Sequence, residues 1–302
     1  MEYNKEHFKK LLPKRPAGSH KGTFGHVLNI AGSGLYTGAA YFSSVAPLKV
    51  GCGLVTLASE ATTCKAIASL SPDVILMPIN KISKEKINTF QSISIGCGLS
   101  TNKNAVKVFK KLMKLLKNSQ TPIVIDADGL NILSSRHCET WVCGFNKNFS
   151  LKQSCSLTQL PKHLSLPLNT ILTPHPKELS RLMGVTIDDI LSQPEFWVKK
   201  CCGKYNCTTV LKLHKTLVAD NKGNFYENNT GNSALSHGGS GDVLCGMING
   251  FLAQGLNCFD SCCLAVHLHG LAGEIASNEL TQYSVLASDL LKYIPQAIKT
   301  II

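Results

Sequence analysis

Short runs of β-forming residues alternate with helical patterns along this 302-residue chain. The runs that predict strands are His26–Ala31, Leu54–Ala58, Ser92–Gly96, Ile123–Asp126, Thr170–Thr173 and Thr208–Leu213, with two weaker ones at Thr216–Ala219 and Asn224–Glu227. The patterns that predict helices are Gly38–Val50, Asn102–Lys117, Pro176–Met183, Pro194–Tyr205, Gly241–Gln254, Cys262–Ser277 and Ala287–Lys299. This alternation indicates an α/β fold in which a mainly parallel sheet carries helices on both faces.

Glycines and polar side chains gather directly after four of the predicted strands. The four clusters are Gly32-Ser33-Gly34, Gly96-Cys97-Gly98, Asp126-Ala127-Asp128-Gly129 and Thr173-Pro174-His175-Pro176. In sheets of this kind, ligands bind at the carboxyl ends of the strands. Four clusters at four such ends are more specific than any one of them, so we expect a ligand site there.

The strongest single signal for chemistry is a glycine-rich stretch before an apolar helix. Gly238-Gly239-Ser240-Gly241-Asp242 follows Asn228-Asn229-Thr230-Gly231-Asn232 and opens the apolar run Val243 to Leu252. Backbone N–H groups and the helix dipole make such a start suitable for a phosphate or a developing oxyanion. Asp242 adds a carboxylate where a substrate hydroxyl can lose its proton, as phosphoryl transfer to an alcohol requires. The alternative is a plain glycine turn capped by Ser240 or Asp242.

Two other glycine motifs bear on nucleotide binding. Gly32 to Gly38 is similar to a dinucleotide-binding turn, but its Gly-x-Gly-x-x-x-Gly spacing is one residue too long. Another kind of strand-to-helix turn is at least as good an interpretation, which leaves a NAD-dependent dehydrogenase as a weak alternative. The pattern Gly-x-x-x-x-Gly-Lys-Ser/Thr does not occur in the sequence, so a P-loop is excluded.

Three polar groups have two interpretations each. Asp126 and Asp128 either hold Mg²⁺ through water or clamp a loop. His175 stands on a turn stiffened by two prolines, where it either contacts a ligand or is an ordinary surface histidine. The stretch 212–216 is a predicted hairpin turn, whose basic residues either neutralise phosphates or are solvated. We assign no residue as a direct metal ligand.

The composition of the chain limits which cell compartment and which classes of partner we expect. The chain has 31 Lys and Arg against 19 Asp and Glu, and the net charge of +12 suits nucleotides and is also compatible with nucleic acid. Thirteen cysteines without a Cys-x-x-Cys motif, after a polar N-terminus, indicate reduced thiols in a cytoplasmic protein. No apolar run reaches membrane-spanning length, so we expect no membrane partner. We expect one domain over residues 1–302, with 134–169 as a long loop or insertion.

Taken together, the motifs resemble those of the ADP- or ATP-dependent NAD(P)H-hydrate dehydratases, members of the ribokinase-like superfamily. The matching stretches span nearly the whole chain and are 20–27, 31–33 with 36–40, 51–56, 126–131, 171–178, 232–242, 269–273 and 286–290. The resemblance implies a ribokinase-like three-layer fold and a lyase that repairs hydrated NAD(P)H. With ADP, or less favourably ATP, and with Mg²⁺, it would phosphorylate the hydroxyl of the hydrate's S-epimer, and phosphate would then leave.

The resemblance also implies roles for individual residues. Asp242 would be the base and a substrate contact. The other hydrate contacts would be Ala39, Ala40, Gly98 and His175. The nucleotide contacts would be Lys212, Leu213, His214, Lys215, Thr216, Asn232, Gly239 and Gly241. Small molecules rather than nucleic acid would be the ligands, and a homo-oligomer such as a tetramer is implied. Because many members carry an epimerase domain ahead of this module and this chain has no room for one, we expect a stand-alone dehydratase.

One physical difficulty and several departures accompany this resemblance. A helix N-terminus is expected to lower the pKa of Asp242 and weaken it as a base, for which proton transfer concerted with phosphoryl transfer would compensate. Cys97 stands where proline is usual, Leu213 where glycine is usual, Asn229 where proline is usual, and His237 where a small or hydroxyl-bearing residue is usual.

Two further candidates stay open, and the departures at Leu213 and His237 bear on the second of them. A vitamin kinase of the same superfamily would lack the pair of stretches 36–40 and 173–176, which this chain has. A non-catalytic relative would bind nucleotide without turnover.

Overall fold

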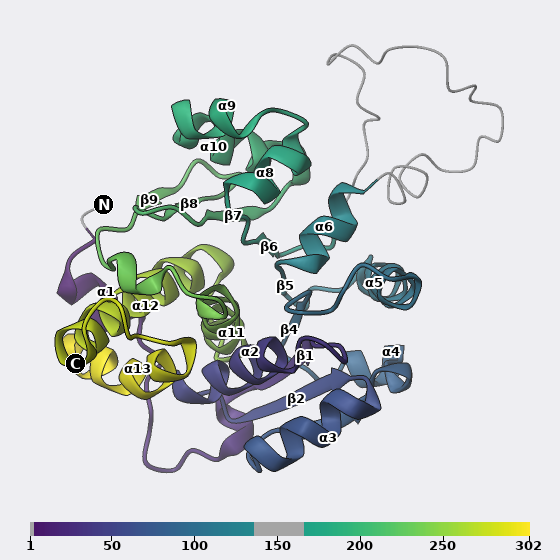
Figure 1. Ribbon diagram of the computed structural model, residues 1–302. Coiled ribbons are helices and arrows are strands. Elements are labelled where there is room, and N and C mark those ends of the chain that lie inside the picture. Colours follow the sequence, from purple (N-terminus) through teal and green to yellow (C-terminus); the bar gives the residue numbers. More distant parts are fainter. Residues whose placement is uncertain (1–2, 136–165) are drawn as a thin grey trace, which may run out of the picture.

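The computed structural model describes residues 3–135 and 166–302, and its centre is one mixed sheet (Figure 1). The strands are β1 His26–Ile30, β2 Leu54–Ser59, β3 Ile75–Pro78, β4 Ser92–Ile95, β5 Ile123–Ile125, β6 Thr170–Leu172, β7 Thr208–Leu211, β8 Leu217–Ala219 and β9 Phe225–Glu227. Their order across the sheet is β3-β2-β1-β4-β5-β6-β7-β8-β9. Neighbours from β3 to β7 run parallel, and β8 and β9 continue the sheet as antiparallel strands. The predicted mainly parallel sheet is confirmed.

The sequence analysis missed one strand, β3. It pairs only with β2 at the edge of the sheet, ends in Pro78, and leaves Ile75 46% exposed. A short edge strand has one partner and little burial, so its sequence carries only a weak strand pattern. The predicted insertion over 134–169 falls mainly on 136–165, which lie outside the described residues.

Helices cover both faces of the sheet. They are α1 Lys5–Leu11, α2 Thr37–Lys49, α3 Ala61–Leu70, α4 Lys84–Ile87, α5 Lys103–Leu116, α6 Asp128–Ser134, α8 Pro176–Met183, α9 Ile187–Ser192, α10 Pro194–Tyr205, α11 Ser240–Ala253, α12 Cys258–Leu280 and α13 Ala287–Ile301. Three 3₁₀ turns are η1 Lys21–Phe24, η2 Ile79–Lys81 and η3 Ser233–Leu235. Within residues 3–135 and 166–302, no helix combines the length and apolar character needed to cross a membrane.

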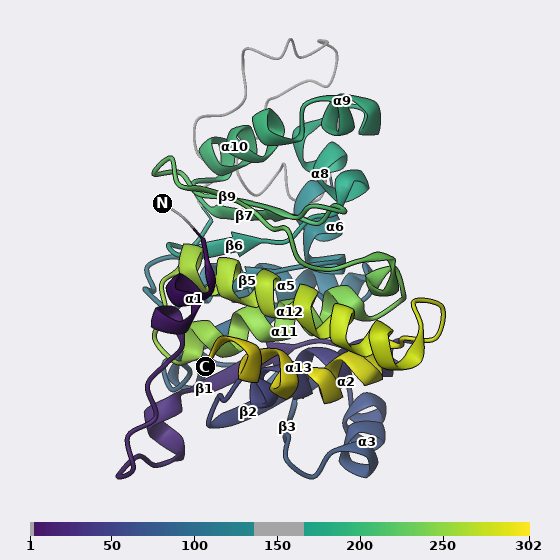
Figure 2. The same cartoon turned by 90° about the vertical axis from the view of Figure 1, so that its left-hand side faces the viewer.

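Two buried clusters join these helices to the sheet in three layers. One cluster packs α1, α2, α11, α12 and α13 on one face, and the other packs α5, α6, α8, α9 and α10 on the opposite face. The turned view in Figure 2 shows α11, α12 and α13 in front of the sheet. The predicted α/β fold with helices on both faces is therefore confirmed.

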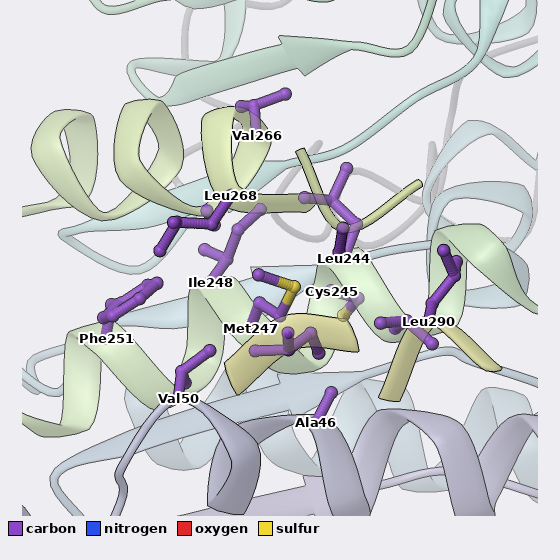
Figure 3. Packing of buried hydrophobic residues seen from close by; sticks show 14 of the residues in the cluster. Ala46, Val50, Leu244, Cys245, Met247, Ile248, Phe251, Val266, Leu268 and Leu290 are labelled. Atoms are coloured by element: carbon purple, nitrogen blue, oxygen red, sulfur yellow. The ribbon is translucent and has the colours of Figure 1, made fainter. Parts of the chain in front are cut away.

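Two glycines let α11 approach α2 closely. A Cβ added at Gly246 would lie 2.8 Å from the carbonyl oxygen of Ser43, and one at Gly250 would lie 2.6 Å from Cγ2 of Val50. Figure 3 shows Ala46 on the side of α2 that faces α11, and Val50, directly after the end of α2, also below α11. Because any side chain at these glycines would push the helices apart, their contact fixes the position of α11.

A buried polar network ties the same two helices to the centre of the sheet. Asn29 of β1 donates to the hydroxyls of Ser43 (2.8 Å) and Ser44 (2.9 Å) on α2. Ser94 of β4 donates to Asn29 Oδ1 (2.8 Å) and accepts a hydrogen bond from Asn249 of α11 (2.8 Å). Asn249 Oδ1 has no hydrogen-bond partner among the described residues, whereas the other bonds of this network are directional and buried. These bonds favour one register of α2 and α11 on the sheet.

Candidate active site

A cavity of about 390 Å³ opens at the carboxyl edge of the sheet. Its walls come from the loop before α2, the loops after β4 and β5, and the first turn of α11. The lining residues are Tyr36, Ala39, Gly98, Ser100, Thr101, Ala127, Asp128 and Asp242. Three residues that the sequence analysis assigned to the hydrate, Ala39, Gly98 and Asp242, thus meet in one cavity.

The start of α11 has the backbone that an anion site needs. Gly239 lies just before the helix with φ of +94°, and a Cβ there would lie 2.7 Å from the ring of Phe42. The first N–H groups of a helix have no partner within it and attract negative charge. The buried His269 of α12 holds this turn, because its Nε2 lies 3.0 Å from the carbonyl oxygen of Ser240 and 3.2 Å from the Ser240 hydroxyl. Burial lowers the pKa of His269 to about 4, which keeps the ring neutral near pH 7.

Asp242, in the first turn of α11, is a stronger base than the sequence indicated. Burial, and then the charge of Asp126, raise its pKa from the usual 3.8 to about 6, although Cys97 and Lys212 act in the opposite direction. The expectation that the helix N-terminus lowers this pKa is wrong, because loss of hydration and neighbouring carboxylates outweigh the helix dipole. A carboxylate with a pKa near neutrality is well suited to remove a proton.

A partly buried ion pair lies close to Asp242, with 21% of the Lys212 side chain and 2% of the Asp126 side chain exposed. Lys212 Nζ lies 2.7 Å from Asp126 Oδ1 and 4.0 Å from Glu178 Oε2. Burial alone would lower the pKa of Lys212, but the charges of Asp126 and Glu178 outweigh burial and raise it. Burial raises the pKa of Glu178 to about 7 against the attraction of Lys212. A Cβ at Gly241 would lie 3.5 Å from Lys212 Nζ, so this ion pair borders the start of α11.

Asp126 and Asp128 both act as loop clamps in the structure. Asp126 accepts a hydrogen bond from the N–H of Ala127 (2.9 Å) in addition to its bond from Lys212. Asp128 accepts one from the N–H of Ser100 (2.7 Å) and one from Asn131 (3.2 Å). Asp128 also lines the cavity, whereas Asp126 is buried behind it with 1% exposure. Both carboxylates thus accept the hydrogen bonds that the clamp interpretation predicts, and the Mg²⁺ interpretation stays a prediction.

His175 caps α8. Its Nδ1 accepts from the N–H groups of Lys177 (3.1 Å) and Glu178 (3.4 Å), and the Glu178 carboxylate accepts from the N–H of His175 (2.9 Å). The Nε2 atom lies 3.5 Å from Glu178 Oε1, and 45% of the side chain is exposed. The structure therefore gives His175 a capping role, and its contact with the hydrate stays a prediction.

The residues predicted to bind nucleotide lie on two segments. The 212–216 turn joins the antiparallel β7 and β8, where Lys215 pairs with Glu227 (3.1 Å) and the Thr216 hydroxyl donates to the carbonyl oxygen of Leu213 (3.2 Å). His214 is exposed in the same turn. Asn232 caps η3 and donates to the Ser277 hydroxyl (2.9 Å).

Ala40 is fully buried and is not part of the cavity wall. Its Cβ lies 2.7 Å from where a Cβ at Gly32 would stand, so it shapes the loop after β1 from beneath. Four lining residues were not assigned from the sequence: Tyr36, Ser100, Thr101 and Ala127. Ser100 and Thr101 follow the Gly96–Gly98 cluster after one intervening residue, Leu99, a signal that points to a longer ligand loop than we assigned.

A glycine-lined helix start with an adjacent carboxylate, at the carboxyl edge of a mainly parallel three-layer sheet, defines a ribokinase-like α/β protein. A ribokinase-like superfamily protein from Enterococcus faecalis matches with a TM-score of 0.81 and 26% identity, over 99% of this chain and 95% of its own. The sequence profile described as NAD(P)H-hydrate dehydratase matches residues 27–148 and 155–296. The chain belongs to the NAD(P)H-hydrate dehydratase family.

Individual relatives agree with this assignment. The ADP-dependent (S)-NAD(P)H-hydrate dehydratase of Neisseria meningitidis serogroup B is 35% identical over 270 residues, covering 89% of this chain and 82% of the relative. A crystal structure of the ADP/ATP-dependent NAD(P)H-hydrate dehydratase of Bacillus subtilis, co-crystallised with ATP and Mg²⁺, matches with a TM-score of 0.82 and 26% identity over 99% of this chain and 98% of that one. The bifunctional NAD(P)H-hydrate repair enzyme of Moorella thermoacetica is 32% identical over 96% of this chain, which spans 52% of that relative.

Proposed function

We propose that this protein is a nucleotide-dependent (S)-NAD(P)H-hydrate dehydratase, a lyase that restores NAD(P)H. The observation that carries the proposal is one cavity in which Ala39, Gly98 and Asp242 meet beside the N-terminus of α11. Membership of the dehydratase family supports the substrate, and the names of the relatives support the S-epimer and ADP as phosphoryl donor. ATP is the less favoured donor.

The chemistry begins at the hydroxyl of the hydrate. Asp242 removes its proton, and the hydroxyl oxygen attacks the terminal phosphorus of the nucleotide. The bond from that phosphorus to the bridging oxygen breaks, which leaves AMP when ADP is the donor. The N–H groups at the start of α11, including those of Gly239 and Gly241, would hold the transferring group while its charge spreads over the oxygens. The phosphorylated hydrate then loses phosphate, which leaves far more readily than hydroxide, together with a proton from the neighbouring ring carbon. The carbon–carbon double bond that forms between these two ring carbons restores NAD(P)H.

Mg²⁺ fits this cavity. Asp128 and Asp242 present carboxylate oxygens to it, the ligands that Mg²⁺ prefers, usually together with substrate phosphates and water. When bound, the ion would neutralise charge on those phosphates. The ion pair of Lys212 with Asp126 lies behind the cavity and keeps a positive charge near the start of α11.

The remaining assignments belong to the same proposal. The nucleotide would lie along the 212–216 turn and Asn232 as well as the start of α11, and the hydrate would reach towards His175. Ala40 would act by supporting Ala39 from below. A single domain, a cytoplasmic location and a homo-oligomer such as a tetramer stay predictions for this chain.

The proposal is tested by Asp242→Asn. The variant should lose recovery of NADH from hydrated NADH in the presence of Mg²⁺ and ADP, while its affinity for ADP, measured by calorimetry, stays within a few-fold of the wild type. The matched control is Asp73→Asn, because Asp73 is exposed and lies outside the cavity. If the Asp242→Asn variant kept its activity, the assignment of Asp242 as the base would be wrong. Wild-type ADP binding without turnover would favour a non-catalytic relative, and phosphorylation of a vitamin alcohol instead would favour the kinase alternative.

A further inference from the structure

Two thiols and a carboxylate meet beneath the floor of the cavity. Cys97 follows β4, Asp126 follows β5, and Cys245 lies in the second turn of α11. One ligand atom of each lies within 4.8 Å of those of the other two, and Cys97 Sγ is 3.9 Å from Asp126 Oδ2. All three side chains are buried, with exposures of 1%, 1% and 0%.

We propose that these three residues form a binding site for a thiophilic divalent cation, with Zn²⁺ as its best match. Thiolate sulfur and carboxylate oxygen are a ligand set for Zn²⁺, whereas Mg²⁺ takes oxygen ligands. Ligand atoms around a tetrahedral Zn²⁺ stand about 3.5 to 4 Å apart, given Zn–S and Zn–O bonds of about 2.3 and 2.1 Å. The cluster therefore needs to contract by no more than about 1 Å.

The charges in this region balance when such an ion binds. Cysteine thiols ordinarily carry their proton at neutral pH, and Asp126 is paired with Lys212 at 2.7 Å through its Oδ1 atom. Binding would replace two thiol protons by one dication, so the net charge of the buried region stays the same. Asp126 would use Oδ2, which already faces Cys97, and would keep its bond to Lys212 through Oδ1.

The fourth ligand position connects this site to the cavity. Asp242 interacts with the Cys97 thiol and lines the cavity, so its carboxylate would supply a further oxygen ligand from the cavity side. An ion held there would take up the carboxylate that the proposed function needs as a base. The site is therefore inhibitory, and Zn²⁺ should compete with turnover rather than support it. The binding itself stands apart from the proposed function, since the ligand set does not depend on any substrate.

Cobalt(II) and proton release test the site directly. The whole chain, treated with a chelator and kept reduced with a phosphine, is titrated with Co²⁺ and then with Zn²⁺. We expect a thiolate-to-cobalt charge-transfer band with the intensity of a tetrahedral site, its loss on addition of Zn²⁺, and release of about two protons per ion in weak buffer. Cys97→Ala and Cys245→Ala should each weaken binding by more than the roughly 10- to 100-fold that outer-shell changes produce.

The control variant is Cys64→Ser, because Cys64 is half-buried on α3 and belongs to no part of the cluster. It should keep the band and the proton count of the wild type. A band that persists in the Cys97→Ala/Cys245→Ala double variant, or that Cys64→Ser removes equally, overturns the site. Each variant is first checked by its thermal melting, and Cys97→Pro replaces Cys97→Ala if that variant fails to fold. The cobalt and proton measurements require no turnover, so they can be interpreted even if the wild-type chain has no dehydratase activity. Failure of this metal site and failure of the proposed function are therefore distinguishable.

Discussion

Replacing Asp242 by Asn should stabilise the fold at neutral pH while removing turnover. Burial and the charge of Asp126 raise the pKa of Asp242 from 3.8 to about 6, a shift of about two pH units. One unit corresponds to about 1.4 kcal/mol, so ionising this carboxylate in the folded state costs up to about 3 kcal/mol. Asparagine carries no charge but loses the attraction of Lys212 and the contact with Cys97, so we expect a net gain of about 1 to 3 kcal/mol.

The pH dependence of this gain has a definite sign. Between the unfolded pKa of 3.8 and the folded pKa of about 6, the folded chain binds the proton of Asp242 more tightly than the unfolded chain does. The wild type's free energy of unfolding therefore falls as the pH rises through this window, and that contribution is absent from the Asn variant. The difference between the two proteins should be small near pH 4 and reach its full size above about pH 6.

Urea unfolding of both proteins at a series of pH values measures this difference. The control is Asp73→Asn, whose exposed carboxylate should leave the free energy of unfolding within about 0.5 kcal/mol of the wild type throughout. The reasoning is refuted if Asp242→Asn is no more stable than the wild type at neutral pH, or if its advantage is largest at acidic pH.

The structure predicts three further results. The value of kcat/KM should fall with decreasing pH below about 6, because Asp242 must be ionised to act, and a flat profile from pH 5 to 8 would contradict this. Lys212→Met leaves Asp126 buried without its cation and should cost about 3 to 5 kcal/mol in urea unfolding, with most of the loss recovered when Asp126→Asn is added. In thermal melting, Gly246→Ala should destabilise the fold by about 1 to 3 kcal/mol, because the added Cβ meets the carbonyl oxygen of Ser43. The control Gly203→Ala adds its Cβ to open space on α10 and should stabilise the fold by about 0.5 to 1 kcal/mol. Equal effects of the two substitutions would contradict the close contact between α2 and α11.

The sheet could be predicted because its central strands are buried on both faces. β1, β4 and β5 are short apolar or β-branched runs bounded by glycines and acids, and such runs are recognisable without any knowledge of their neighbours. α3 was not predicted, and it contributes little to the core, since it buries only Thr63 and Ile67. The predicted helix Cys262–Ser277 corresponds to α12, which begins four residues earlier, at Cys258, because Asn257 caps it.

The sequence predicted only those features of the site that depend on residues close to one another along the chain. The strand-end clusters locate Gly98 and Asp128 at one edge, and the glycine-rich stretch locates Asp242 at a helix start. The ion pair between Lys212 and Asp126 was not predicted, because nothing in the sequence indicates that these two residues, 86 positions apart, are in contact. The pKa of Asp242 depends on burial and on the charge of Asp126. The helix dipole, which is the only local influence on this group, therefore predicted the direction of the pKa shift wrongly.

The stoichiometry of NADH recovery is the sharpest test of phosphoryl transfer to the hydrate. Hydrated NADH, Mg²⁺ and ADP are incubated with the protein, and the NADH absorbance is followed together with AMP and inorganic phosphate. We expect one AMP and one phosphate for each NADH restored, and no recovery without nucleotide or with Asp242→Asn. Recovery of NADH without nucleotide consumption, or consumption of ADP without recovery, would contradict phosphoryl transfer to the hydrate at Asp242.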